Sequence, residues 1–157
     1  MLTNNDMLRT LRYALNMSDT AMMEIINLSG HALEPFDLAG LLKKEDERGY
    51  RICSDAVLGW FLDGLITRNR GKREIVPDQV KGPAAPLNNN AILKKLRIAL
   101  ELDEENMLGI MKLANINVSR SELTALFRKK EHKNYKECGD QFLRSFLKGL
   151  AVRYRAK

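Results

Sequence analysis

The chain repeats itself once, and this duplication constrains the fold more than any other feature of the sequence. The segment CSDAVLGWFLDGLITRNR at 53–70 returns as CGDQFLRSFLKGLAVRYR at 138–155, an offset of 138 − 53 = 85 residues. The same offset relates 4–72 to 89–157 without a gap, and 24 of the 69 aligned residues are identical. A segment that occurs twice predicts two copies of one structural unit, related by an approximate two-fold axis.

Each copy has the hydrophobic spacing of four helices. Leu8, Leu11 and Leu15 recur at intervals of three and four residues, as on one helix face, and no stretch alternates as a strand does. The predicted helices are 5–17, 18–28, one that begins at 34–35 and one that begins at 55, then 90–102, 103–113, 119–130 and 140–154. The sequence therefore predicts an all-α fold of two pseudo-two-fold-related four-helix repeats.

The two repeats, 1–72 and 89–157, are separated by the segment 73–88, which contains three of the four prolines. Such a Pro-rich segment predicts an extended linker that lets the second repeat fold back on the first. A unit of about 70 residues is marginal alone. We therefore expect the repeats to share a buried face in one body, as a monomer or a weak homodimer.

Residues that are identical in both copies are first interpreted as structural, because a duplicated core needs the same packing twice. Asp55 and Asp140 are predicted N-caps of the fourth helix of each repeat, either alone or while also pairing with the arginine of the first helix. Gly64 and Gly149 lie within that helix, where glycine is costly, so they predict a close approach of two helices. At 119–122, Ser-Arg-Ser-Glu has the pattern of a capping box.

The two cysteines, Cys53 and Cys138, occupy the same place in the two copies. We predict buried structural thiols, which is how free cysteine usually behaves. Two alternatives stay open: a disulfide across the pseudo-dyad, and a reactive thiolate at Cys138, six residues after His132. No Cys-x-x-Cys or His-x-x-x-His pair supplies zinc-ligand spacing, and no glycine-rich phosphate loop is present. The sequence thus predicts no catalytic residue, metal or cofactor.

The location of the protein is predicted from what the chain lacks. No apolar run approaches the roughly 20 residues that span a bilayer, and the first residues, MLTNNDMLRTLR, have no secretory signal pattern. We therefore expect a cytoplasmic protein that does not enter a membrane.

Charge divides unevenly between the copies, and this asymmetry is the main indication of function. The first repeat holds 9 Lys/Arg against 10 Asp/Glu, whereas the second holds 15 against 8, a net charge of +7. A basic surface of this kind binds nucleic-acid phosphates through charge. The residues that we predict to contact RNA or DNA are Lys94, Lys95, Arg120, Arg128, Lys129, Lys130, Lys133, Arg144 and Lys148.

Other functions fit parts of the same sequence. An acidic protein could be the partner of the basic repeat, with the region of Trp60 meeting an apolar one, because Trp60 is matched by Ser145 and so belongs to one copy. Residues 107–127 also have the spacing of a helix-turn-helix, whose second helix can enter the major groove of DNA. The basic residues could equally form an ordinary solvated surface.

The duplicated motif also resembles a known family. Its elements are Asn-Asn followed by Leu-Arg-x-Ala-Leu, a charged loop, Tyr-x-x-Cys-x-Asp-x-x-Leu-x-x-Phe-Leu-x-Gly-Leu, and Arg-x-Arg-x-Lys. This pattern is similar to that of the YehS-like family, bacterial cytoplasmic proteins of two such repeats to which no function is assigned. The resemblance implies an all-helical duplicated fold and an intracellular bacterial protein, and it supplies no active site.

Overall fold

The computed structural model describes residues 2–31, 33–70 and 87–155, and every regular element within these ranges is an α-helix. The helices are α1 (Asn4–Ala14), α2 (Asp19–Leu28), α3 (Pro35–Leu41), α4 (Asp55–Arg70), α5 (Asn89–Ala99), α6 (Glu104–Leu113), α7 (Arg120–Leu126) and α8 (Asp140–Arg155). The predicted all-α fold of two four-helix repeats is confirmed. Of the predicted linker 73–88, residues 73–86 lie outside the described ranges.

Several helices end earlier than predicted, either at a local reversal of the chain or where a distant amide takes over a carbonyl of the last turn. The first helix of each repeat stops before Asn16 or Glu101, which both have a φ of 52° and reverse the chain. The predicted helix 119–130 ends at Leu126, because the carbonyl of Ala125 accepts instead from the amide of Lys136, 3.0 Å away. The basic residues that follow Leu126 therefore lie on a loop and not on a helix.

The capping predictions have mixed outcomes. Ser119 and Glu122 form the predicted capping box. The prediction that Asp55 caps α4 is wrong, since the hydroxyl of Ser54 accepts from the amide of Val57. An N-cap must precede the first helical residue, and Asp55 is already that residue.

The aspartate at the start of each fourth helix bonds to an asparagine of the first helix. The amide of Asn4 donates to Asp55 over 2.7 Å, and that of Asn89 donates to Asp140 over 2.8 Å. Asp140 also accepts from the amide of Leu2, and these two hydrogen bonds, the Asn89 bond foremost, lower the pKa of its carboxyl. The prediction of a cap is wrong at Asp140 as well, because Asp140 is already the first residue of α8.

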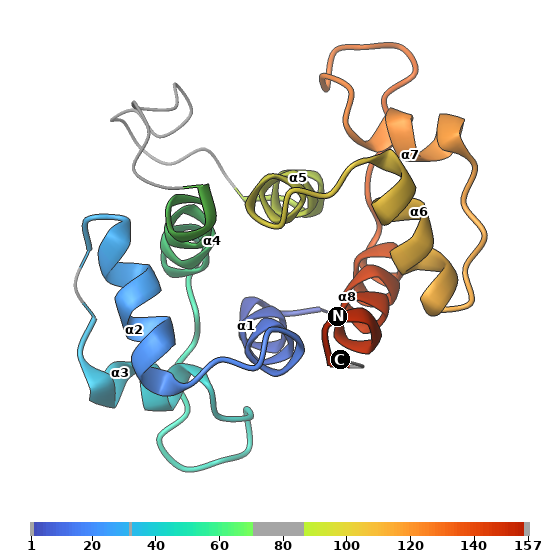
Figure 1. Ribbon diagram of the computed structural model, residues 1–157. Coiled ribbons are helices and arrows are strands. Elements are labelled where there is room, and N and C mark those ends of the chain that lie inside the picture. Colours follow the sequence, from blue (N-terminus) through green and yellow to red (C-terminus); the bar gives the residue numbers. More distant parts are fainter. Residues whose placement is uncertain (1, 32, 71–86, 156–157) are drawn as a thin grey trace.

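The two repeats exchange their first helices. Figure 1 shows α1, α4, α5 and α8 in the middle, with α2 and α3 on one side and α6 and α7 on the other. Within the described ranges, α1 packs chiefly against α8 of the second repeat, and α5 packs chiefly against α4 of the first. A single hydrophobic cluster, with Phe61 and Phe146 completely buried, runs through both repeats. Each repeat thus completes its core with a helix of the other.

The exchanged helices run in the same direction as their partners. At the start of α1 and α8 the Leu2 amide donates to Asp140, and at their ends Arg155 donates to the carbonyl of Tyr13 over 2.9 Å. At the ends of α4 and α5, Asn69 donates to the carbonyl of Ala99 over 2.8 Å. The two inter-repeat helix pairs therefore have corresponding registers, and the pseudo-dyad relates one pair to the other.

Gly64 and Gly149 confirm the predicted close approach of helices. A Cβ atom at Gly64 would lie 1.8 Å from the carbonyl oxygen of Ile25, and one at Gly149 would lie 2.0 Å from that of Ile110. Any side chain would therefore collide with the backbone of a neighbouring helix. This contact sets how closely α4 lies on α2 and α8 on α6.

Candidate nucleic-acid interface

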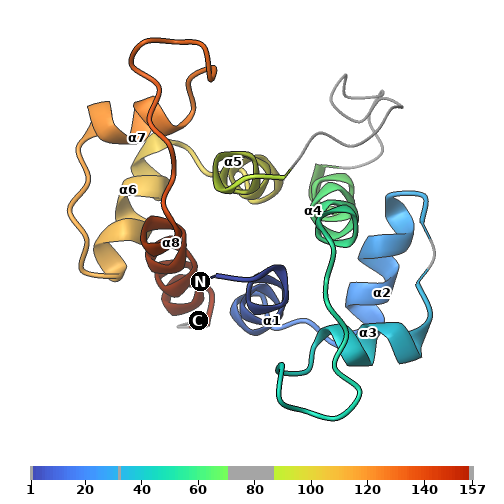
Figure 2. The ribbon, with the colours of Figure 1, turned by 180° about the vertical axis from the view of Figure 1, so that it is seen from behind.

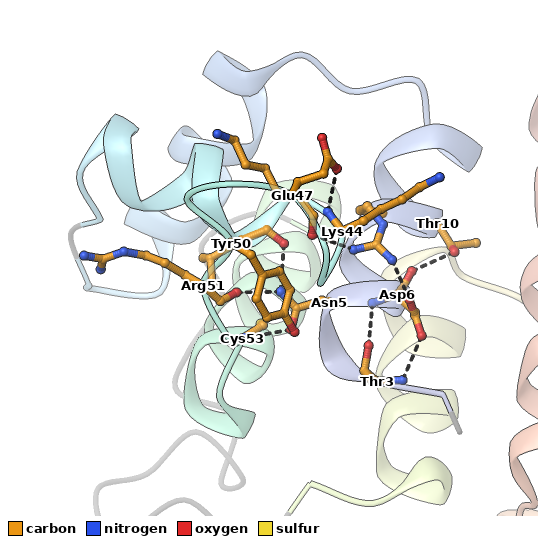
Figure 3. A network of polar contacts seen from close by, with 12 residues as sticks. Thr3, Asn5, Asp6, Thr10, Lys44, Glu47, Tyr50, Arg51 and Cys53 are labelled. Carbon is orange, nitrogen blue, oxygen red and sulfur yellow. Dashed lines mark hydrogen bonds and ion pairs between the residues drawn. The ribbon is translucent and has the colours of Figure 1, made fainter.

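Two equivalent loops join the third and fourth helices of the repeats, and each is held by one buried asparagine. Figure 3 shows the loop 42–54 of the first repeat around Asn5. The side-chain amide of Asn5 donates to the carbonyls of Leu41 and Arg51, over 3.0 and 2.7 Å, and its oxygen accepts from the amide of Cys53 over 2.9 Å. One side chain thus ties both ends of the loop to α1.

Asn90 plays the same part for the loop 127–139 of the second repeat. It donates to the carbonyls of Leu126 and Lys136, both over 2.9 Å, and accepts from the amide of Cys138 over 2.8 Å. This role was not predicted from the sequence, although Asn4-Asn5 and Asn89-Asn90 are identical between the copies. Because the asparagine holds the loop ends, the side chains on the loop surface can differ without changing its path.

The two loops differ in charge. The segment KKEDER at 43–48 has three basic and three acidic residues, whereas RKKEHK at 128–133 has four basic residues and one acidic. Lys129, Lys130 and Lys133 are exposed, and no carboxylate of the described ranges lies within ion-pair distance of them. Lys44 and Arg48 of the first loop are also exposed and in no ion pair of the described ranges, so the two loops differ in how many acidic residues surround their cations and not in ion pairing. The second repeat therefore presents the more basic loop.

Lys94 and Arg128 belong to the same region. Lys94 is exposed on α5 at the position equivalent to Arg9, whose guanidinium donates to the carbonyl of Lys43 in the first loop. This equivalence places Lys94 beside the basic loop. Arg128 is only half-exposed and lies 3.2 Å from Nε2 of His132. We call Lys94, Arg128, Lys129, Lys130 and Lys133 the loop group.

Arg144 and Lys148 form a second group on a different element. Both are exposed on α8, one helical turn apart. Lys148 is equivalent to Asp63 of α4, which pairs with Lys95 of α5. The residue of α1 that is equivalent to Lys95 is Thr10. The pseudo-dyad therefore places Lys148 of α8 opposite Thr10 of α1. The α8 group therefore lines the contact between α1 and α8, whereas the loop group lies beside α5.

Two of the predicted contacts are neutralised by carboxylates. Lys95 pairs with Asp63 across the repeats at 2.5 Å, and both side chains are about three-quarters buried. Arg120 bonds to Glu104 at 2.7 Å and also to Glu105, and these bonds raise the pKa of its guanidinium. Arg120 is the first residue of the seven-residue α7. In the predicted helix-turn-helix, α7 is the helix that would enter DNA, so these ion pairs engage its first residue.

The two thiols are structural. Cys53 and Cys138 are free, 2% and 3% exposed, so the alternative of a disulfide is wrong. Burial, with a smaller effect of Asp55, raises the pKa of Cys53 to about 12, and burial with Asp140 raises that of Cys138 to about 11. Both groups are protonated at neutral pH and are poor nucleophiles.

The described ranges hold neither a candidate metal cluster nor a helix that could span a membrane. Within them, no group of three or more His, Cys, Asp or Glu residues could hold a metal ion. His132 bonds through its ring to the amide of Asn134 and to Arg128. Among the described helices, none is long and apolar enough to cross a bilayer.

Trp60 and two exposed apolar residues lie in the first repeat. Trp60 is half-buried and stacks on His31, with ring centroids 4.1 Å apart and planes 11° apart, so it serves packing. The most exposed apolar side chains are instead Ile52 and Phe36, 79% and 74% exposed. The guanidinium carbon of Arg51 lies 5.6 Å from the Phe36 ring centre.

Comparisons with known proteins agree with the duplicated architecture. The family described as "Protein of unknown function (DUF1456)" matches twice, over residues 4–71 and 89–156. The chain is 44% identical over 154 residues to the "Uncharacterized protein YehS" of Escherichia coli strain K12, covering 98% of this chain and 97% of that protein. No solved structure matches the chain.

Proposed function

The chain belongs to the family of unknown function DUF1456, and we propose from its geometry that it is a small non-enzymatic protein that binds nucleic-acid phosphates. Exposed lysines without carboxylate partners on the second repeat support this proposal most directly. Phosphate oxygens bind such cations and release counterions, which supplies affinity without sequence choice. Neutralisation of Lys95 and Arg120 reduces the predicted interface to the loop group, Arg144 and Lys148.

The duplication provides an internal control for this proposal. Lys129 and Lys133 occupy the positions of Lys44 and Arg48, on loops that are held by equivalent asparagines. Lys44 and Arg48 lie in the segment 43–48 with three acidic residues, whereas Lys129 and Lys133 lie in the equivalent segment 128–133 with one. Removal of the same two charges from either loop should therefore have different effects on binding.

The test is fluorescence anisotropy of the purified protein with labelled RNA and duplex DNA at several salt concentrations. Binding to at least one of them should weaken steeply with salt. The variant Lys129→Gln/Lys133→Gln should lower the slope of log affinity against log salt by about 1.4 to 1.8, since each phosphate contact contributes about 0.7 to 0.9. The control Lys44→Gln/Arg48→Gln should leave the slope unchanged.

Absence of binding at low salt, or equal losses in the two loop variants, would refute the proposal. A protein-interaction module is the second candidate, and the exposure of Phe36 and Ile52 favours it. Phe36→Ser/Ile52→Glu replaces both residues with those at the equivalent positions 121 and 137. Under the nucleic-acid proposal this variant should bind like the wild type, whereas an adaptor should lose its protein partner.

A further inference from the structure

The contact between α1 and α8 combines an exposed aromatic ring with a row of cations. Tyr13 of α1 is 58% exposed, and the guanidinium carbon of Arg155 lies 4.1 Å from its ring centre. Arg155 also donates to the carbonyl of Tyr13 over 2.9 Å, which fixes the pair. Arg144 and Lys148 are exposed on the same helix as Arg155. We call Tyr13, Arg144, Lys148 and Arg155 the α1–α8 seam.

The equivalent contact between α4 and α5 lacks this combination. The position of Tyr13 is taken there by Ile98, that of Arg144 by Gly59 and that of Lys148 by Asp63. Asp63 is neutralised by Lys95, so that contact is closed by an ion pair. Since the two helix pairs share one register, the difference lies in the side chains. Packing alone therefore does not require an aromatic ring and unpaired cations at the α1–α8 seam.

Carboxylates on the same two helices have other partners. Asp140, one turn before Arg144, accepts from Asn89 and from the amide of Leu2, and the charge of Arg144 makes a smaller contribution to the lowered pKa of its carboxyl. Asp6 of α1 bonds to Arg9 and to the amide of Thr3. Within the described ranges, no carboxylate lies within ion-pair distance of Arg144 or Lys148. The seam thus keeps a local excess of positive charge. Figure 2 shows α1 and α8 side by side.

We propose that the α1–α8 seam is a track for single-stranded nucleic acid, in which Arg144 and Lys148 hold phosphates and an unpaired base stacks on Tyr13. The inference rests on the proposed function and deepens it by naming the strand state. Proteins that bind single strands combine cations that follow the backbone with aromatic rings on which bases stack. A duplex keeps its base faces stacked inside, so it offers the Tyr13 ring nothing to stack on.

Fluorescence anisotropy of the 157-residue protein tests the stacking on Tyr13. It uses three labelled probes of one length: single-stranded RNA, the same strand with abasic residues around its centre, and a duplex. The key variant is Tyr13→Ile, which installs the residue found at position 98. It should weaken binding of the intact single strand about fivefold or more. Binding of the abasic strand and the duplex, and the salt slope, should not change. Tyr13→Phe keeps a ring and should bind like the wild type.

The charges of the seam have their own signature. Arg144→Gln/Lys148→Gln should lower the single-strand salt slope by about 1.4, since each contact contributes about 0.7 on single strands. Circular dichroism should show that all variants retain the wild-type helix content.

The outcomes separate the seam from the proposed function. If the wild type binds no nucleic acid, both proposals are wrong. If Lys129→Gln/Lys133→Gln weakens binding but Tyr13→Ile does not, the proposed function stands and the seam is overturned. Equal weakening of the intact and abasic strands by Tyr13→Ile also overturns it, because stacking would then play no part.

Discussion

Asn90 is the residue whose replacement tests most directly how the basic loop is built. The side chain is almost buried, and it makes three hydrogen bonds of 2.8 to 2.9 Å with the main chain of Leu126, Lys136 and Cys138. A hydrogen bond of this kind contributes about 1 kcal/mol net. Asn90→Ala should therefore lower the free energy of unfolding by about 3 kcal/mol, a large part of the roughly 5 to 15 kcal/mol of a typical domain.

Urea unfolding followed by far-ultraviolet circular dichroism measures this loss, and Asn5→Ala is its matched control. Asn5 makes the corresponding bonds in the first repeat, so its replacement should cost a similar amount. Under the proposed function, only Asn90→Ala should also weaken nucleic-acid binding in conditions where both variants remain folded. The reason is that Asn90 holds the basic loop and Asn5 the charge-balanced one.

Two results would contradict this reasoning. A loss of less than about 0.5 kcal/mol, the size expected for an ordinary surface substitution, would mean that the asparagine does not hold the loop ends. Asn5 also accepts from the hydroxyl of Tyr50 over 3.3 Å, a longer bond that Asn90 lacks within the described ranges. A difference of more than about 1 kcal/mol, the size of that one bond, between Asn5→Ala and Asn90→Ala would mean that the two loops are anchored by different interactions.

Two further predictions concern packing and pH. Gly64→Ala should destabilise the protein by about 3 kcal/mol or more, because the added Cβ overpacks against a backbone carbonyl. The control Gly59→Ala, whose added Cβ meets no atom within 4 Å, should be neutral or stabilising by up to about 1 kcal/mol. Thermal unfolding compares the two variants, and equal effects would contradict the close approach. The buried thiol of Cys138 has its pKa raised from 9.0 to about 11, so the folded state keeps the proton where the unfolded state releases it. The resulting contribution to stability is present below pH 9 and should be lost by about 1.4 kcal/mol per pH unit from pH 9 towards pH 11. Denaturant unfolding across this range should show that the free energy of unfolding declines less steeply with pH in Cys138→Ala than in the wild type. Equal declines in the two proteins would show that the thiol is not desolvated.

Local sequence patterns predicted much of the fold correctly. Helical periodicity identified the eight helices of the described ranges, because a buried helix face repeats its apolar residues every three to four positions. Glycine at the same helical place in both copies indicated the close approach at Gly64 and Gly149. Local rules were less reliable where competing partners lay far along the chain. Asp55 follows the capping residue by one position and bonds to Asn4, 51 residues away.

Charge counting located the basic repeat but not its available cations. Lys95 and Lys94 are neighbours in the sequence, yet Lys95 is paired with Asp63 in the other repeat, 32 residues away. Arg120 is likewise engaged by carboxylates 15 and 16 residues before it. A lysine is neutralised only if the packing of the helices brings a carboxylate close to it. A count of charges contains no information about such distances.

The sequence by itself determined that the protein is a duplicated all-helical chain with one basic half, because periodicity, identity and charge are local properties. Only the tertiary structure decided that α1 pairs with α8 and α5 with α4. An apolar stripe shows that a helix face is buried but does not say against which helix. That pairing brings Tyr13 to Arg155, 142 residues apart, and so creates the α1–α8 seam. It arises because each marginal repeat buries its remaining apolar face against the other.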